Sequence, residues 1–151
     1  MRAMDDAKAV ALKLWVVLAR AHAALEQRAA EDVARHDLTL AEFGVLEALF
    51  HKGPLLLGDV QKKVLVSSGG VTYLVDRLEE RGLVRRKLCE EDRRARYAEL
   101  TESGATLMRR IFPEHAECIR DAVAGLDSDD QTAAIDLLKQ LGLHAAQQPI
   151  S

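Results

Sequence analysis

The sequence predicts a mostly α-helical fold that carries one small β-hairpin. Apolar residues recur at helical spacing along most of the chain, and only three prolines and nine glycines interrupt its 151 residues. Two short β-like runs, residues 83–88 and 96–100, flank one charged, turn-like segment. Apolar residues make up 48% of the chain but aromatic ones only 4%, which favours a helical core of Leu, Val and Ala over a sandwich or barrel. The length fits one structural unit.

The first predicted helix spans about thirty residues and ends near His36. No Gly or Pro occurs before Gly44. The apolar stripe of this helix contains Ala7, Val10, Ala11, Leu14, Leu18, Ala21 and Leu25, and is widened by Trp15, Val17 and Val33. A chain of this length has little left to cover both ends of such a helix, whereas a second copy can cover it. We therefore expect a homodimer; a long helix packed only on its own chain is the alternative.

Three shorter helices are predicted next. Thr39 and Glu42 have the spacing of a capping box, and Gly53-Pro54 ends the helix that they begin. A short helix follows over residues 57–65. The fourth helix covers residues 68–81, with Gly82 in the position that a helix-ending glycine prefers. Its inward face has the spacing i, i+3, i+4, i+7 and consists of Val71, Leu74, Val75 and Leu78.

The end of the chain is predicted to be helical again. Thr101 caps a long helix that runs through Ile119, and Pro113 is expected to kink or break it. Asp127 or Ser128 begins the last helix, with Ala134, Ile135, Leu138 and Leu141 expected to point inward. We assign residues 1–36 and 104–151 to a helical dimerisation region that surrounds residues 38–101.

Three helices followed by a two-stranded hairpin is the element order of a winged helix-turn-helix. In that motif the second helix of the pair enters the major groove of DNA. We therefore assign residues 38–101 to a winged helix-turn-helix DNA-binding region. Its outward face here holds small, hydroxyl or cationic residues, which suit a groove about 12 Å wide better than the Glu, Lys and Gln of an ordinary solvated face. The predicted DNA contacts from this helix are Ser67, Ser68, Gly69, Gly70, Thr72, Tyr73 and Arg77.

The two glycines at the start of this helix admit a second interpretation, a phosphate-binding loop. No strand precedes them and no Lys-Ser/Thr pair follows them, so this interpretation fails. At the mouth of a recognition helix, missing side chains let backbone N–H groups approach phosphates and base edges. Direct base readout is then expected to shift to Thr72, Tyr73 and Arg77.

The hairpin tip is the second predicted DNA contact. Residues 81–96 hold seven Arg or Lys against three acids, a local charge of +4 in a chain whose net charge is −3. Arg93, Arg94 and Arg96 lie at this tip, and arginine suits a narrow minor groove. Asp92 is expected to hold Arg94 in place by an ion pair. The alternative for the charged run is a solvated face.

Residues 66–104 resemble the multiple antibiotic resistance regulator (MarR) family. The end of the recognition helix matches the family pattern at Leu78, Glu79, Gly82, Leu83, Val84 and Arg86, and the wing matches it at Asp92, Arg94, Leu100, Thr101 and Gly104. The resemblance implies a homodimer that binds a palindromic operator as a transcriptional repressor. It also implies that DNA is released when a small aromatic or phenolic effector binds. Many members have Ser or Thr in place of Gly69 and Gly70, which leaves the operator sequence open.

The effector is less well indicated than the DNA target. Candidate pocket residues are Trp15, His22, Phe43, Phe50 and His51, although the aromatic residues can equally be core and the histidines surface. A redox-sensing regulator that uses Cys89 or Cys118 is an alternative. His115 and Cys118 have metal-ligand spacing, but two ligands do not make a metal site, so no metal and no cofactor are expected.

Other classes of function are disfavoured by the sequence. No nucleophile-elbow, zinc-protease or nucleotide-binding motif occurs, so we expect no enzyme. A helical dimerisation module without DNA affinity is the alternative from another class. Two cysteines do not form a disulfide framework, and neither a signal peptide nor a membrane-spanning run is evident, so we expect a cytoplasmic protein without a membrane partner.

Overall fold

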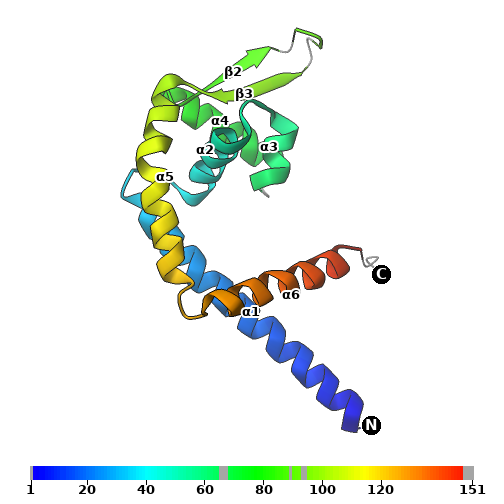
Figure 1. Ribbon diagram of the computed structural model, residues 1–151. Coiled ribbons are helices and arrows are strands. Elements are labelled where there is room, and N and C mark those ends of the chain that lie inside the picture. Colours follow the sequence, from blue (N-terminus) through cyan, green and yellow to red (C-terminus); the bar gives the residue numbers. More distant parts are fainter. Residues whose placement is uncertain (1, 65–67, 89, 93–94, 148–151) are drawn as a thin grey trace.

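The computed structural model describes residues 2–64, 68–88, 90–92 and 95–147 (Figure 1). In chain order its elements are α1 (Arg2–Ala34), α2 (Leu40–Lys52), β1 (Leu55–Leu56), α3 (Leu57–Val64), α4 (Ser68–Glu80), β2 (Val84–Leu88), β3 (Arg96–Leu100), α5 (Glu102–Ala122) and α6 (Ser128–Gln147). The strands form one antiparallel sheet in the order β1-β3-β2. The predicted mostly helical fold with a β-hairpin wing is confirmed, and β1 is an addition that the sequence did not indicate.

The ends of α2 form as the sequence predicts. The hydroxyl of Thr39 accepts the backbone N–H of Glu42 at 3.1 Å, and a carboxylate oxygen of Glu42 accepts the N–H of Thr39 at 3.0 Å. At the other end, Gly53 takes a φ of 77° and donates its N–H to the carbonyl of Leu49. This φ favours glycine. The capping box and the glycine thus fix where the helix begins and ends.

The hairpin is joined to α5 by a tight junction around Thr101. The Thr101 hydroxyl donates to the carbonyl of Gly82 at 2.6 Å and accepts the N–H of Gly104 at 3.0 Å. The Thr101 backbone N–H donates to the carbonyl of Leu83 at 3.0 Å. A Cβ atom placed on Gly104 would overlap that same carbonyl oxygen. The Leu-Thr-x-x-Gly pattern therefore serves a close backbone contact between the start of the hairpin and the start of α5.

The core lies in the half of the molecule that contains the sheet. Phe43, Leu46, Leu78, Met108 and Ile111 have their side chains almost completely buried there. From α1, the core receives Val33 near the C-terminal end of the helix. Burial of side chains from α2, α4 and α5 together fixes the orientation of α4, which is the predicted recognition helix.

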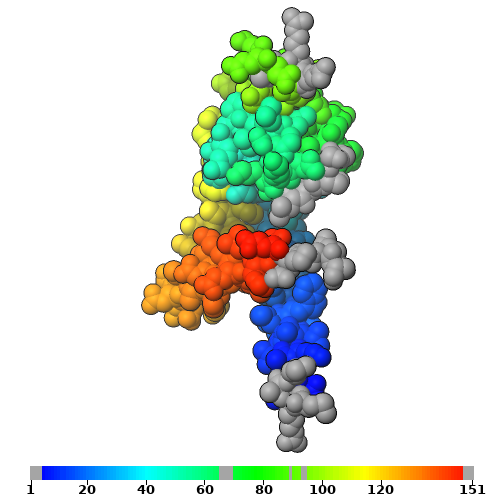
Figure 2. Space-filling view, turned by 90° about the vertical axis from the view of Figure 1, so that its right-hand side faces the viewer, coloured from blue at the N-terminus to red at the C-terminus, as the bar shows by residue number. Residues whose placement is uncertain are grey.

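The two helical arms outside this core expose their apolar faces. Figure 2 shows the N-terminal half of α1 projecting away from α2 and α3, with α6 in between. Val10, Trp15 and Val17 on α1 are more than half exposed, at 69%, 72% and 53%.

The sequence predicted that the apolar face of α6 points inward, and within a single chain this prediction was wrong. No residue of α6 is buried: Ile135, Leu138 and Leu141 are exposed and Ala134 is half-buried. The periodicity identified the apolar face of this helix correctly, but the chain itself supplies no surface that covers it.

Helix α5 continues without a break across Pro113. Proline removes one backbone N–H donor but leaves the helix uninterrupted here, so of the predicted kink or break, the break does not occur. Among the residues that the structure describes, no helix has the length and apolarity that crossing a bilayer requires.

Candidate nucleic-acid interface

Helix α4 presents the predicted recognition face to solvent. Val71, Leu74, Val75 and Leu78 are buried against the core, as their spacing predicts. On the opposite side Thr72 is exposed and Tyr73 is 60% exposed. The helix begins at Ser68, so Gly69 and Gly70 both belong to its first turn. Ser67 lies outside the described residues.

Arg77 on this face is held by two neighbours. Its guanidinium carbon lies 5.8 Å from the centre of the Tyr73 ring, and Nε lies 3.7 Å from a carboxylate oxygen of Glu42. A hydrogen bond with Tyr73, followed by the charges of Tyr73 and Glu42, raises the pKa of Arg77 above its usual value. Arg77 therefore keeps its charge and has a preferred position beside Tyr73 before any DNA arrives.

Glu42 connects α2 to the recognition helix. Its side chain is only 3% exposed, and Oε1 is used in the capping box with Thr39. Oε2 has no hydrogen-bond partner, but it lies between Arg77 at 3.7 Å and Arg81 at 4.0 Å. A buried carboxylate normally requires such compensation. Sequence reasoning had assigned Glu42 only to the cap, because the position of α4 beside it depends on the tertiary fold.

The base of the wing is tied to the recognition helix by Arg86 on β2. Its Nη1 lies 2.7 Å from a carboxylate oxygen of Asp76 and donates to Glu79 at 3.1 Å, and Nη2 donates to the carbonyl of Thr72 at 3.4 Å. Arg86 is 24% exposed, so this ion pair is less screened than a surface pair. Sequence reasoning had placed Arg86 in a family pattern without assigning it a contact. The structure shows that it links β2 of the wing to three residues of the recognition helix.

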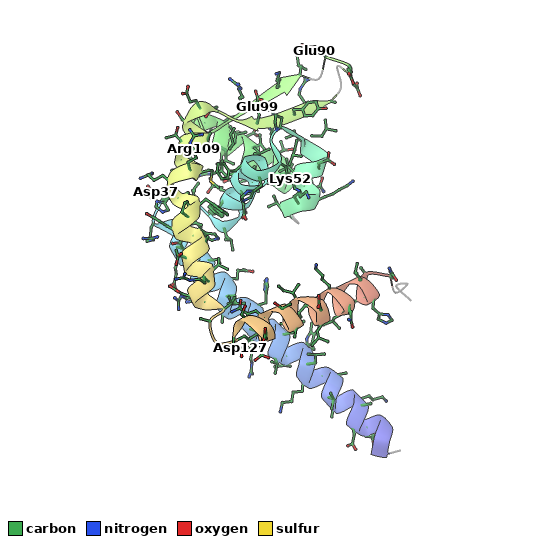
Figure 3. All side chains as sticks on the ribbon, viewed as in Figure 1. Asp37, Lys52, Glu90, Glu99, Arg109 and Asp127 are labelled. Atoms are coloured by element: carbon green, nitrogen blue, oxygen red, sulfur yellow. The ribbon has the colours of Figure 1, made fainter. Side chains whose placement is uncertain are left out.

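The wing itself extends from the body of the protein. Figure 3 shows Glu90 towards the far end of the hairpin and Glu99 on β3, nearer its base. Arg96 begins β3 and is exposed, and the carbonyl of Asp92 accepts the N–H of Ala95 at 3.0 Å. Arg93 and Arg94 lie outside the described residues, and so does the predicted ion pair between Asp92 and Arg94.

Three of the five candidate effector residues, Phe43, Phe50 and His51, lie on α2 and contact α5. Phe43 is buried, and its ring lies 4.4 Å from that of His115. Phe50 and His51 form a second aromatic contact with Phe112, with ring centres 4.7–5.9 Å apart. These contacts bring α2 and α5 together.

Trp15 and His22 are placed differently, on the exposed part of α1. The Trp15 side chain is in solvent, and His22 faces Glu26 on its own helix at 3.6 Å. Neither lines the cavity of about 470 Å³ that borders Phe43 and His115. The other residues lining that cavity are Glu26, Leu40, Ala41, Gly44, Glu47, Lys63 and Val64.

His115 and Cys118 both face α1 rather than a common ligand position. Nδ1 of His115 lies 3.0 Å from a carboxylate oxygen of Asp32, and the thiol of Cys118 donates to the carbonyl of Arg28 at 3.8 Å. Burial acts to raise the pKa of Asp32, but hydrogen bonds from Arg35 and His115 outweigh it and lower that pKa. Cys89, the other redox candidate, lies outside the described residues.

Three comparisons bear on this geometry. A sequence model described as MarR family matches residues 36–95. The HTH-type transcriptional regulator MhqR of Bacillus subtilis is 39% identical over 136 residues, which cover 90% of this chain and 94% of MhqR. The chain belongs to the MarR family.

Solved structures agree with this assignment. AbsC, a MarR family transcriptional regulator from Streptomyces coelicolor, superimposes with a TM-score of 0.83 at 26% identity, covering 91% of this chain and 95% of AbsC. BpsR of Bordetella bronchiseptica, whose DNA binding is regulated by 6-hydroxynicotinic acid, superimposes with a TM-score of 0.78 at 26% identity, covering 86% and 98% of the two chains. This MarR-family protein is thus a DNA-binding transcriptional regulator with a winged helix-turn-helix.

Proposed function

We propose that this protein is a homodimeric repressor that binds a palindromic operator and releases it when a small aromatic or phenolic molecule binds. The observation that carries the DNA-binding part is the fixed outward face of α4. Arg77 is held by Tyr73 and Glu42, and Arg86 ties the wing to the same helix. Such pre-positioned groups lose little freedom when they meet a groove. An operator target would also place the protein in the cytoplasm.

The predicted DNA-binding residues keep their roles in this proposal. Thr72, Tyr73 and Arg77 would read base edges, while the first turn of α4, with Ser68, Gly69 and Gly70, would approach the backbone. Arg93, Arg94 and Arg96 would enter the neighbouring minor groove from the wing. A base-edge contact of arginine is worth about 1–3 kcal/mol of discrimination between bases.

The exposed arms support the dimer. The apolar faces of α1 and α6 are uncovered in one chain, and apolar surface of this extent marks an interaction site. A two-fold related copy would bury both faces at once and would place two recognition helices in successive major grooves. We assign residues 1–36 and 104–151 to this contact and residues 38–101 to DNA binding.

The effector part of the proposal rests on the cavity beside Phe43. Its volume of about 470 Å³ suits a single-ring molecule, and it lies beside α2, whose Glu42 contacts the recognition helix. BpsR responds to a hydroxylated aromatic acid, which is consistent with a ligand of this kind here. A ligand that displaced Phe43 would move α2 and, through Glu42, Arg77 and Arg81.

Selection of bound DNA from a random pool tests the proposal. The expected product is an inverted repeat with half-sites about one helical turn apart, and its affinity should fall steeply as salt rises. Sedimentation of the protein–DNA complex should give two chains per site. Absence of any enriched sequence, even at low salt, would favour a dimerisation module that does not bind DNA.

Titrating the selected protein–DNA complex with a panel of phenols and aromatic acids tests the effector. At least one compound should weaken operator binding, and Phe43→Leu, which keeps an apolar side chain, should reduce that response. Phe50→Leu serves as the matched control on the same helix. If no compound acts but peroxide releases the DNA, and replacement of both cysteines by serine abolishes that release, the redox alternative is favoured.

A further inference from the structure

A second cavity, of about 640 Å³, lies where three segments of the protein meet. It is bordered by the connection between α1 and α2, by the C-terminal end of α4 and by the first turns of α5. Figure 3 shows Asp37 of that connection on the same edge of the molecule as Arg109 of α5. The residues that line the cavity are His36, Arg81, Leu83, Glu102, Ser103, Thr106, Leu107 and Arg110. Cavities of this size hold small molecules in other proteins.

The lining carries a surplus of positive charge. Arg81 and Arg110 stand against Glu102, so two cations minus one anion leave +1 with His36 neutral. Arg110 makes no hydrogen bond and no ion pair with any residue that the structure describes. Its guanidinium therefore retains its five N–H donors for a partner.

Arg81 is held in place by the backbone. Nη1 donates to the carbonyl of Asp37 at 2.6 Å and Nη2 to the carbonyl of His36 at 3.4 Å. The carboxylate of Glu42 lies 4.0 Å away and forms an ion pair with Arg81 that it shares with Arg77. These contacts orient the guanidinium and use two of its five N–H groups.

The remaining polar groups of the lining fit a small, oxygen-rich ligand. Ser103 and Thr106 each carry a hydroxyl, and the Thr106 hydroxyl accepts a hydrogen bond from Arg109 at 3.2 Å. Leu83 and Leu107 supply the apolar part of the lining. Guanidinium groups pair with carboxylates and phosphates through two parallel hydrogen bonds.

We propose that this cavity binds a small oxyanion, a carboxylate or a phosphate group, between Arg81 and Arg110. DNA phosphates do not fit the position, because Arg81 follows the C-terminal end of α4 whereas DNA would approach Ser68 at its other end. Thirteen helical residues separate these ends by about 20 Å. The ligand is therefore a free molecule, and its site is distinct from the aromatic cavity beside Phe43.

Amide chemical shifts of the full-length protein test the site without any DNA. Sodium phosphate and sodium benzoate are titrated separately, with sodium chloride keeping the ionic strength constant. At least one of them should give saturable shifts at Ser103, Thr106 and Leu107. Saturation by phosphate alone identifies a phosphate-type ligand, and saturation by benzoate alone identifies a carboxylate. The site proposal is overturned if neither probe saturates these amides.

Matched variants decide whether Arg110 is responsible. Arg110→Gln should weaken the better probe by about tenfold or more, which corresponds to about 1.4 kcal/mol. Arg120→Gln removes the same charge from the far end of α5, where the side chain is 71% exposed and does not line the cavity, and should leave the affinity within about twofold. Equal binding by wild type and Arg110→Gln would place the anion elsewhere and refute the site.

If circular dichroism shows that Arg110→Gln is poorly folded, a second variant still tests the site. Thr106→Glu introduces a carboxylate at an exposed position of the lining, on a helix that tolerates glutamate. It should abolish saturable binding by charge repulsion, and unchanged binding would refute the site. Because none of these measurements uses an operator, a failure of repression would leave their result unaffected.

Discussion

Glu42 on α2 and Arg77 on α4 face each other, with Nε of Arg77 3.7 Å from Oε2 of Glu42. The carboxylate is buried while the guanidinium reaches the recognition face, so the pair connects the capping box of one helix to the DNA-facing side of another. Arg81 approaches the same oxygen at 4.0 Å. One buried negative charge therefore helps to position two cations, Arg77 on α4 and Arg81 directly after it.

Replacing Glu42 with Gln should weaken operator binding while leaving the fold intact. Glutamine serves in a capping box as glutamate does, so the start of α2 is retained, but Arg77 loses its buried anion. We expect affinity to fall about three- to tenfold, on the order of 1 kcal/mol, as measured by fluorescence anisotropy. Glu47→Gln, on the same helix and 42% exposed, is the control and should change little. Unaltered affinity in Glu42→Gln would exclude Glu42 from positioning Arg77.

Replacing Arg86 with Gln should affect both stability and DNA binding. Asp76 and Glu79 would lose their common partner, and the wing would lose its link to the carbonyl of Thr72. We expect a loss of about 1–3 kcal/mol in the free energy of unfolding, measured with urea, and weaker operator binding. Arg85→Gln, whose side chain is 65% exposed, should lose less than about 1 kcal/mol. Equal losses in both variants would mean that Arg86 is an ordinary surface cation.

Replacing Gly104 with Ala should destabilise the protein although alanine is the better helix former. The added methyl group would overlap the carbonyl oxygen of Leu83, which is backbone and cannot turn aside. Overpacking of this kind costs about 1–3 kcal/mol, visible as a lower urea midpoint. Gly58→Ala is the matched control, because no atom lies within 4 Å of the new Cβ, and it should be neutral or slightly stabilising. A stabilised Gly104→Ala would contradict the close contact.

The loss of folding stability at acidic pH should depend on Asp32. Its carboxylate is 6% exposed and is bonded by Arg35 at 2.6 Å and His115 at 3.0 Å, which together hold its pKa below the ordinary value. A lowered pKa in the folded state contributes stability that is complete above the ordinary carboxyl pKa and is lost as the pH falls through the folded value. Glu114 also faces Arg35, at 3.5 Å.

Asp32→Asn should therefore be less stable than the wild type at pH 7, by about 1–3 kcal/mol. The difference should shrink as the pH falls below about 4, because the wild-type carboxyl then becomes neutral as well. Urea unfolding at successive pH values measures both. Asp121→Asn, at an exposed carboxylate, should show no such convergence. A pH-independent difference would assign the effect of Asp32 to packing.

Local signals predicted most of the helices and the hairpin because each depends on nearby residues. Thr39, Gly53, Gly82 and Thr101 fix helix ends through contacts within a few residues or within one junction. Strand β1 was not predicted, because it has only two residues and is defined by its pairing with Tyr97 and Ala98 on β3.

Tertiary relations were harder to predict than the elements. The apolar face of α6 was identified from its period, but a single chain leaves it exposed, because periodicity does not say which surface covers a helix. The second role of Glu42 required the position of α4. The anion cavity required Arg81 and Arg110, which are twenty-nine positions apart in sequence.

The two glycines in the first turn of α4 lead to a prediction about operator choice. Gly70 is the half-buried third residue of the helix, and serine there would add a hydroxyl to the turn that approaches DNA. Gly70→Ser should leave the fold intact or slightly stabilise it, because serine is the better helix former. Sequences selected from a random DNA pool should then differ from those of the wild type at one or two positions in each half-site, by about 1–3 kcal/mol per base pair.

The Gly70→Ala variant separates the effect of the hydroxyl from that of the added carbon. If alanine changes the selected sequence as serine does, steric exclusion sets the preference. A change seen only with serine indicates a new hydrogen bond to a base edge. Selected sequences identical for all three proteins would show that this turn does not approach the bases, and would leave base readout to Thr72, Tyr73 and Arg77.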